Sequence, residues 1–168
     1  MIAVIAFNNS NEFSTPDEEN DLLGPAFANA IDGGTLFMNG TKIQLIGLRP
    51  LQVDKLCQDA EGNDYACGRD ARRYLQSLVQ NNRVLCAPLF ANGVDRVTAS
   101  CRLQYEGVPT PESFGAFFDD NDASNLSRLV VARGYALVSG IGLERLAELQ
   151  TEAQRTRQGV WAGSFDPD

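Results

Sequence analysis

The chain of 168 residues is long enough for one domain with a hydrophobic core and too short for two ordinary ones. Its 14 Lys and Arg stand against 22 Asp and Glu, and the net charge of -8 opposes binding to nucleic-acid phosphates. Histidine is absent, which excludes Ser-His-Asp catalysis, Cys-His catalysis and every histidine metal ligand.

The N-terminal residues 1–23 are expected to form a flexible leader or tether in front of a single domain over residues 24–168. Met1–Phe7 is apolar, but it lacks a preceding positive residue and is too short for a membrane span or a complete signal peptide. Its composition is compatible with the stub of either. Residues 8–22 are polar, acidic and without periodicity, as in a tether.

Strand patterns come first in the ordered part, and helix patterns come last. Short strands are predicted over Ala26–Ile31, Thr35–Met38 and Lys42–Leu48, with turn signals at residues 32–34 and 39–40. Helices are predicted over Arg69–Gln80, Asn125–Arg133 and Leu143–Gln158, the last two followed by glycine. This order predicts an α+β domain built on a small barrel.

Residues 83–103 are predicted to form a hairpin around a four-residue turn at Asn92–Asp95. The resulting register pairs Val84 with Leu103, Cys86 with Cys101, Pro88 with Ala99, and Phe90 with Val97. All eight of these residues lie on one face, and none of them carries a charge.

The four cysteines fall in two pairs without the tight spacing of a zinc site. Free buried thiols are the alternative. The hairpin register favours bonding of Cys86 with Cys101, and we interpret the other pair as a second disulfide, Cys57–Cys67. Two disulfides indicate an oxidising compartment.

Tyr105–Ser124 is too long for a simple connection between two elements. It carries an aromatic cluster, Phe114, Phe117 and Phe118, next to the acidic residues Asp119, Asp120 and Asp122. Two interpretations are open: the segment folds back onto its own domain, or it presents a docking surface to another protein.

Several motifs together resemble the staphylococcal nuclease family, over most of the chain from Ala26 to Phe165. They are residues 31–36 (IDGGTL), 42–48 (KIQLIGL), 67–71 (CGRDA), 95–101 (DRVTASC), 129–136 (LVVARGYA) and 159–165 (GVWAGSF). The resemblance implies a five-stranded OB-fold β-barrel with three α-helices. The placement of the cysteines resembles that of exported bacterial members, which implies the periplasm or an equivalent oxidising space.

The family's activity is calcium-dependent phosphodiester hydrolysis, which needs carboxylates for the ion, a Glu to activate water and two Arg on the phosphate. At the matching positions, Gly34 replaces an Asp metal ligand and Gln44 replaces the first Arg. Arg49 replaces a second metal ligand, and Gln52 replaces the general base. Arg96 alone matches a catalytic residue.

These replacements predict a catalytically inactive domain without a calcium cofactor. We expect it to act as a protein-binding or accessory subunit in an exported and oxidising compartment, with a membrane-associated complex as one setting. One alternative is an active nuclease in which Asp54 or Asp59 substitutes for the missing carboxylates. The other is a nucleic-acid binder that does not cleave, which the acidic charge disfavours.

Overall fold

The computed structural model describes residues 22–119, 121–140 and 144–167. Most of the expected leader, residues 1–21, lies outside the described residues, and Leu23 already begins the first strand. The strands are β1 (Leu23–Ala26), β2 (Asn29–Ala30), β3 (Thr35–Met38), β4 (Thr41–Leu45), β5 (Leu48–Pro50), β6 (Cys57–Gln58), β7 (Asp64–Tyr65), β8 (Arg83–Ala91), β9 (Arg96–Gln104) and β10 (Ala136–Val138). The α-helices are α1 (Cys67–Val79), α2 (Leu126–Ala132) and α3 (Glu144–Arg155), and two 3₁₀-helices are η1 (Phe114–Phe118) and η2 (Gly159–Ala162).

The main sheet has six strands in the order β1-β8-β9-β4-β3-β2. All of its pairs are antiparallel except β4 with β9, which run parallel. The α+β class and the three helices agree with the sequence-based expectation. The expected closed five-stranded barrel does not form among the described strands, because β1 and β2 remain at the two edges and β5 pairs with β10 in a separate sheet.

The hairpin of β8 and β9 forms with the predicted register as far as Pro88, which lies opposite Ala99. Beyond Pro88 the expectation was wrong. A bulge at Leu89 shifts the register, so that Phe90 lies opposite Thr98 and not Val97. A bulge gives one strand an extra residue without a partner, and the hydrophobic alternation does not reveal it.

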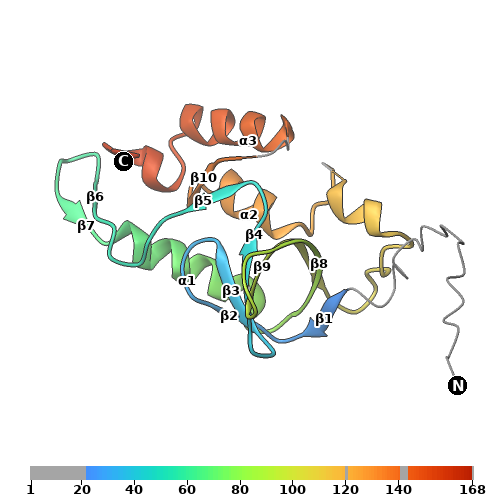
Figure 1. Cartoon of the computed structure of the whole chain (residues 1–168). Helices are drawn as coiled ribbons and strands as arrows, with labels where there is room; N and C mark the ends of the chain where they lie inside the picture. Colours follow the sequence, from blue (N-terminus) through green and yellow to red (C-terminus); the bar gives the residue numbers. More distant parts are fainter. Residues whose placement is uncertain (1–21, 120, 141–143, 168) are drawn as a thin grey trace, which may run out of the picture.

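The main core lies between the inner face of the sheet and the three α-helices; Figure 1 shows α2 and α3 above the strands and α1 lower and to the left. It joins Leu36, Ile43 and Leu45 of the sheet to Leu75 of α1, Val130 of α2 and Leu146 of α3. A smaller core surrounds the Cys57–Cys67 pair. The outer face of the sheet is consequently left for other contacts.

Both predicted disulfides are present, Cys57–Cys67 and Cys86–Cys101. They are consistent with an oxidising, exported compartment. In the parts of the chain that the structure describes, no helix combines the length and the apolar character that a membrane crossing requires.

Candidate functional site

Two rows of side chains lie on the outer face of the sheet, because alternate residues of a strand point to opposite faces. In the first row, Thr35 of β3, Gln44 of β4 and Thr98 of β9 lie side by side. In the next row, Phe37 lies beside Lys42, and Lys42 lies beside Arg96. The intervening residues Leu36, Ile43 and Val97 point into the core. This register brings the β3–β4 hairpin and the distant strand β9 to one surface.

A pocket of about 440 Å³ opens where these rows meet the start of the segment after β5. Its lining consists of Ile31, Asp32, Thr35, Lys42, Gln44, Pro50, Gln52 and Arg96. Gln44, Gln52 and Arg96, which were singled out from the sequence as family positions, therefore meet in one place. Lys42 was missed. Its separation from Gln44 by two residues along one strand was the signal that could have placed it there.

The charged groups of the pocket are two cations, Lys42 and Arg96, and one carboxylate, Asp32. Asp32 is only 8% exposed, and its Oδ1 accepts a hydrogen bond of 2.8 Å from the Gly34 amide. Within the described ranges, no ion pair joins Lys42 or Arg96 to a carboxylate. The pocket is thus positive on balance, with two cations that have no partner inside the described fold.

Gly34 lies outside the lining of the pocket, behind Pro50. A Cβ atom at position 34 would lie 3.0 Å from Pro50 Cβ and 3.4 Å from Leu48 Cδ1. A contact of 3.0 Å is tighter than ordinary carbon packing, so a side chain here requires its neighbours to shift. A carboxylate side chain at position 34 would therefore be crowded by Pro50 and Leu48.

Arg49 does not line the pocket. Its Nη2 atom donates a hydrogen bond of 2.5 Å to the carbonyl oxygen of Pro167, in the C-terminal segment. The positive charge in the pocket comes instead from Lys42 and Arg96, which the sheet register places together.

Gln44 and Gln52 supply neutral amides where relatives of the resembled family carry charged side chains. Gln44 Nε2 donates to the Leu48 carbonyl at 3.4 Å, a contact that spans the turn between β4 and β5. A side-chain amide does not accept a proton near neutral pH, so it cannot act as a general base. Gln52 therefore cannot serve as a base, and Gln44 carries no positive charge.

The two carboxylates proposed as substitutes also lie outside the pocket lining. Asp59 accepts hydrogen bonds from the amides of Glu61 and Asn63 at 3.0 and 2.8 Å. The hydrogen bonds from Asn63 lower the pKa of Asp59 below its ordinary value. This carboxylate is therefore engaged in its own turn, away from Arg96.

The residues of the pocket do not fit a calcium ion. Ca²⁺ takes six to eight oxygen ligands and is held mainly by carboxylates. One carboxylate is present, it already accepts an amide hydrogen bond, and two cations share the pocket with it. In the described part of the chain, no group of three or more Asp, Glu, Cys or His could hold a metal ion.

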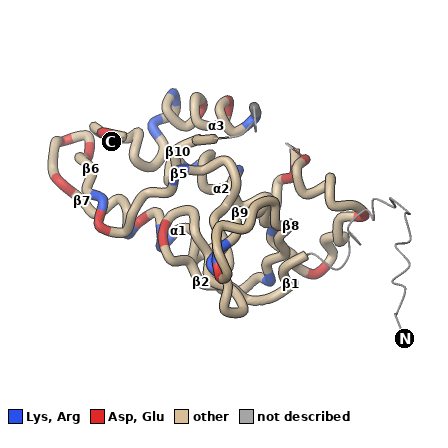
Figure 2. Tube along the Cα trace, viewed as in Figure 1, with Lys and Arg blue, Asp and Glu red and all other residues tan. Residues whose placement is uncertain are grey.

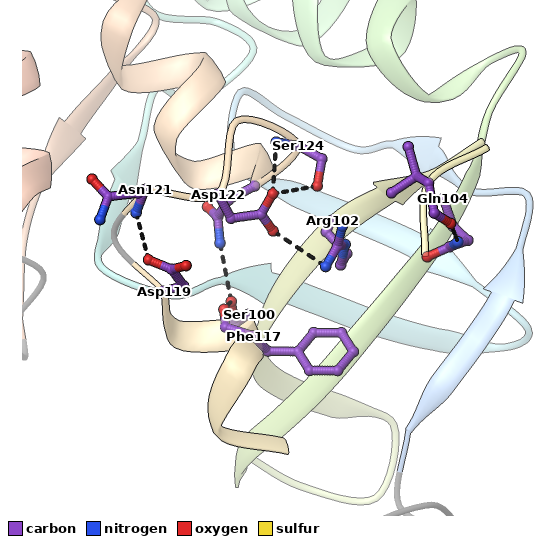
Figure 3. A network of polar contacts seen from close by, with 10 residues as sticks. Ser100, Arg102, Gln104, Phe117, Asp119, Asn121, Asp122 and Ser124 are labelled. Atoms are coloured by element: carbon purple, nitrogen blue, oxygen red, sulfur yellow. Dashed lines mark hydrogen bonds and ion pairs between the residues drawn. The ribbon is translucent and has the colours of Figure 1, made fainter. Parts of the chain in front are cut away.

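The aromatic segment after β9 folds back onto its own sheet (Figure 3). Phe117 is 1% exposed and packs against Leu85 and Ala87, on the outer face of β8. Phe114 and Phe118 are half-buried, and their ring centroids lie 5.5 Å apart. Phe117 is therefore part of the core and is not available to a partner. Asp119 is exposed, and Asp120 lies outside the described residues.

Polar contacts fasten this segment to β9 (Figure 3). Ser100 Oγ donates to the Phe117 carbonyl and accepts from Asn125 Nδ2 at 3.1 Å. Arg102 Nη1 lies 3.6 Å from Asp122 Oδ2, and both side chains are mostly buried. Asp122 Oδ1 accepts from the Ser124 amide and hydroxyl at 2.9 and 2.6 Å. The segment and the sheet thus behave as one unit.

A second pocket, of about 460 Å³, lies beside the Cys57–Cys67 disulfide. Its lining includes Gln58, Asp64, Ser164 and Phe165. Of the candidate site residues only Cys57 lies there, and it is held in its disulfide. The lining of this second pocket contains no Lys or Arg, in contrast to the first pocket.

Comparisons with protein-family models and with curated proteins do not assign the chain to a family. No protein-family model matches the chain, and no curated protein matches it.

Proposed function

We propose that this chain is a nuclease-like domain without phosphodiesterase activity, which serves an exported complex as a protein-binding or accessory subunit. The observation that carries the proposal is the content of the pocket around Arg96, where Gln44 and Gln52 take the positions of charged catalytic groups. Arg96 could contact a phosphate, but without a metal ion, a general base or a second arginine it cannot activate water for hydrolysis.

The order of the elements supports the resemblance to the OB-fold nuclease family. Strands β3, β4, β8 and β9 precede α2 and α3, and α1 is inserted between β7 and β8. The finer assignment as an OB-fold remains part of this proposal, because the described sheet is open. Two disulfides support export, and the periplasm is the compartment that we propose.

The proposal is tested by incubating the pure full chain with single-stranded DNA and with RNA, in calcium and in a chelator. No cleavage above the buffer rate is expected in either condition, because loss of a general base alone costs about 10²–10⁴ in rate. A calorimetric calcium titration should give no binding heat. Scission that requires calcium and disappears in Arg96→Gln would establish the competing function, a working nuclease.

A further inference from the structure

We propose that the outer face of the sheet next to the pocket binds a short acidic segment of a partner protein that also carries an apolar side chain. The face is defined by Phe37, Lys42, Arg96, Thr98 and Phe90 and is called the uncovered face. This inference rests on the proposed protein-binding function and names the place and the chemistry of the contact.

The uncovered face is the part of the sheet surface that the fold leaves open. The neighbouring part, with Leu85 and Ala87 of β8, is covered by Phe117. The aromatic segment also contacts β9 at Ser100, whose hydroxyl donates a hydrogen bond to the Phe117 carbonyl. Two residues further along the same face of β9 lies Thr98, opposite Phe90. The row of Thr98 and Phe90 lies outside the apolar cluster around Phe117, and Phe90 is exposed, so the surface changes from buried to exposed within one strand.

Large aromatic side chains stand at both ends of the uncovered face. Phe37 on β3 is 42% exposed, and Phe90 on β8 is 48% exposed. Between these strands in the sheet lie β4 and β9, which contribute Lys42 and Arg96. Exposed aromatic rings that are gathered on one face, with polar groups beside them, mark an interaction site.

Lys42 and Arg96 make this face positive, so a partner that binds there should carry negative charge. The parallel register of β4 and β9 sets them directly side by side, although like charges repel at that separation. Neither cation is paired with a carboxylate in the described residues, and Asp32 of the adjoining pocket is engaged with an amide. Carboxylates from outside the domain would relieve this repulsion and pair with both cations.

A protein segment suits this face better than a nucleic acid does. The chain as a whole is acidic, with 22 Asp and Glu against 14 Lys and Arg, and Figure 2 shows carboxylate residues along β6–β7, α3 and the segment after β9, interspersed with Lys and Arg. DNA carries one charge per roughly 1.7 Å of helix axis, so it meets this repulsion along its whole length. A short segment with two or three carboxylates meets it only locally, since the Debye length is about 8 Å at physiological salt.

The test uses the full chain and a fluorescein-labelled peptide in which Glu alternates with Phe and Gly, at roughly 0.15 M ionic strength. Binding is followed by fluorescence anisotropy. The double variant Lys42→Gln/Arg96→Gln is expected to weaken the affinity about tenfold, the combined effect of two exposed ion pairs. Phe37→Ala and Phe90→Ala are each expected to weaken it roughly fivefold.

Two matched variants serve as controls. Arg69→Gln removes an exposed cation from α1, and Phe27→Ala removes an exposed ring from the segment between β1 and β2. Both should bind the peptide like the unchanged chain. All four test positions have partly exposed side chains, so equal melting temperatures will show that each variant is folded.

Four results would overturn the inference. Absence of peptide binding, or binding that the four test substitutions leave unchanged, removes the uncovered face as the site. Tighter binding of a labelled oligothymidylate, lost in the same variants, assigns the face to nucleic acid. Self-association in sedimentation that the variants abolish assigns it to a second copy of the chain. None of these binding results bears on nuclease activity. The proposed function is tested separately by the cleavage assay.

Discussion

The Ser100 hydroxyl on β9 donates a hydrogen bond of 2.5 Å to the carbonyl oxygen of Phe117. Through this contact, the segment that leaves the sheet after β9 returns to cover the sheet's own outer face. Phe117 fills the space over Leu85 and Ala87, and Asn125 ties the start of α2 to the same hydroxyl. One buried hydroxyl thus connects the sheet, η1 and α2.

Phe117→Ala is expected to lower the free energy of unfolding by about 3 kcal/mol, because it opens a cavity under η1. Urea denaturation followed by the fluorescence of Trp161 measures the change. Phe114→Ala is the matched control, since Phe114 is half-buried and should cost clearly less. Equal losses in the two variants would mean that η1 does not hold Phe117 against the sheet.

Ser100→Ala is expected to cost about 1–2 kcal/mol of stability. The substitution leaves the Phe117 carbonyl and Asn125 Nδ2 without their partner in a buried place. Thermal unfolding by circular dichroism is the measurement. Ser77→Ala provides the comparison, because Ser77 is exposed and donates only to a carbonyl of its own helix. A Ser100 variant as stable as the Ser77 variant would speak against the network.

Each disulfide is expected to stabilise the fold by about 3 kcal/mol, on the loop-entropy estimate for loops of this length. The closed loops span sequence separations of 10 and 15 residues. Cys57→Ala/Cys67→Ala and Cys86→Ala/Cys101→Ala, each compared with the unchanged chain in urea, give the two values. Alkylation of the unreduced protein should label no thiol in mass spectrometry, and four labelled cysteines would remove the evidence for an oxidising compartment.

Gly34→Asp places a carboxylate where the resembled family carries one, and it is expected to destabilise the fold by about 1–2 kcal/mol without creating a calcium site. The new Cβ would crowd Pro50 Cβ at 3.0 Å, and forced packing of this kind costs stability. Urea unfolding and calcium calorimetry on the same sample test both parts. Gln52→Glu is the comparison, because residue 52 lines the open pocket. Calcium binding heat in Gly34→Asp would show that the pocket can still take the ion.

Stability is expected to fall as the pH rises above about 10. Burial raises the pKa of Tyr74 and of Tyr65 above the ordinary value of 10.0. The folded state therefore keeps protons that the unfolded state has released, and this contribution is lost as the pH rises through the folded pKa. Unfolding midpoints between pH 8 and 11 measure the loss, and Tyr74→Phe should flatten the profile. An unchanged profile in that variant would contradict the assignment.

Much of the fold could be read from the sequence, because its signals are local. The glycines after the second and third predicted helices, Gly134 and Gly159, indeed adopt positive φ. The opposed pair Cys86 and Cys101 followed from strand alternation around one turn, and the disulfide is present. Such patterns depend on neighbours within a few residues, whose geometry the chain itself dictates.

The bulge and the open sheet could not be read in this way. The bulge at Leu89 changes which residue faces Phe90, while the pattern of apolar residues is equally compatible with a regular hairpin. The separation of β5 from the main sheet depends on its pairing with β10, which lies far along the chain. Such pairings are decided by packing among distant segments, where several arrangements satisfy the same local pattern.

The amino-acid sequence by itself determined the chemistry that this protein carries: amides at Gln44 and Gln52, one arginine at position 96, four cysteines and no histidine. Only the tertiary structure decided where that chemistry is placed. It turned Arg49 toward Pro167, buried Phe117 and set Lys42 beside Arg96. The reason is physical: residue types are fixed by covalent structure, whereas the charge of a pocket and the exposure of a ring depend on strand register and long-range packing.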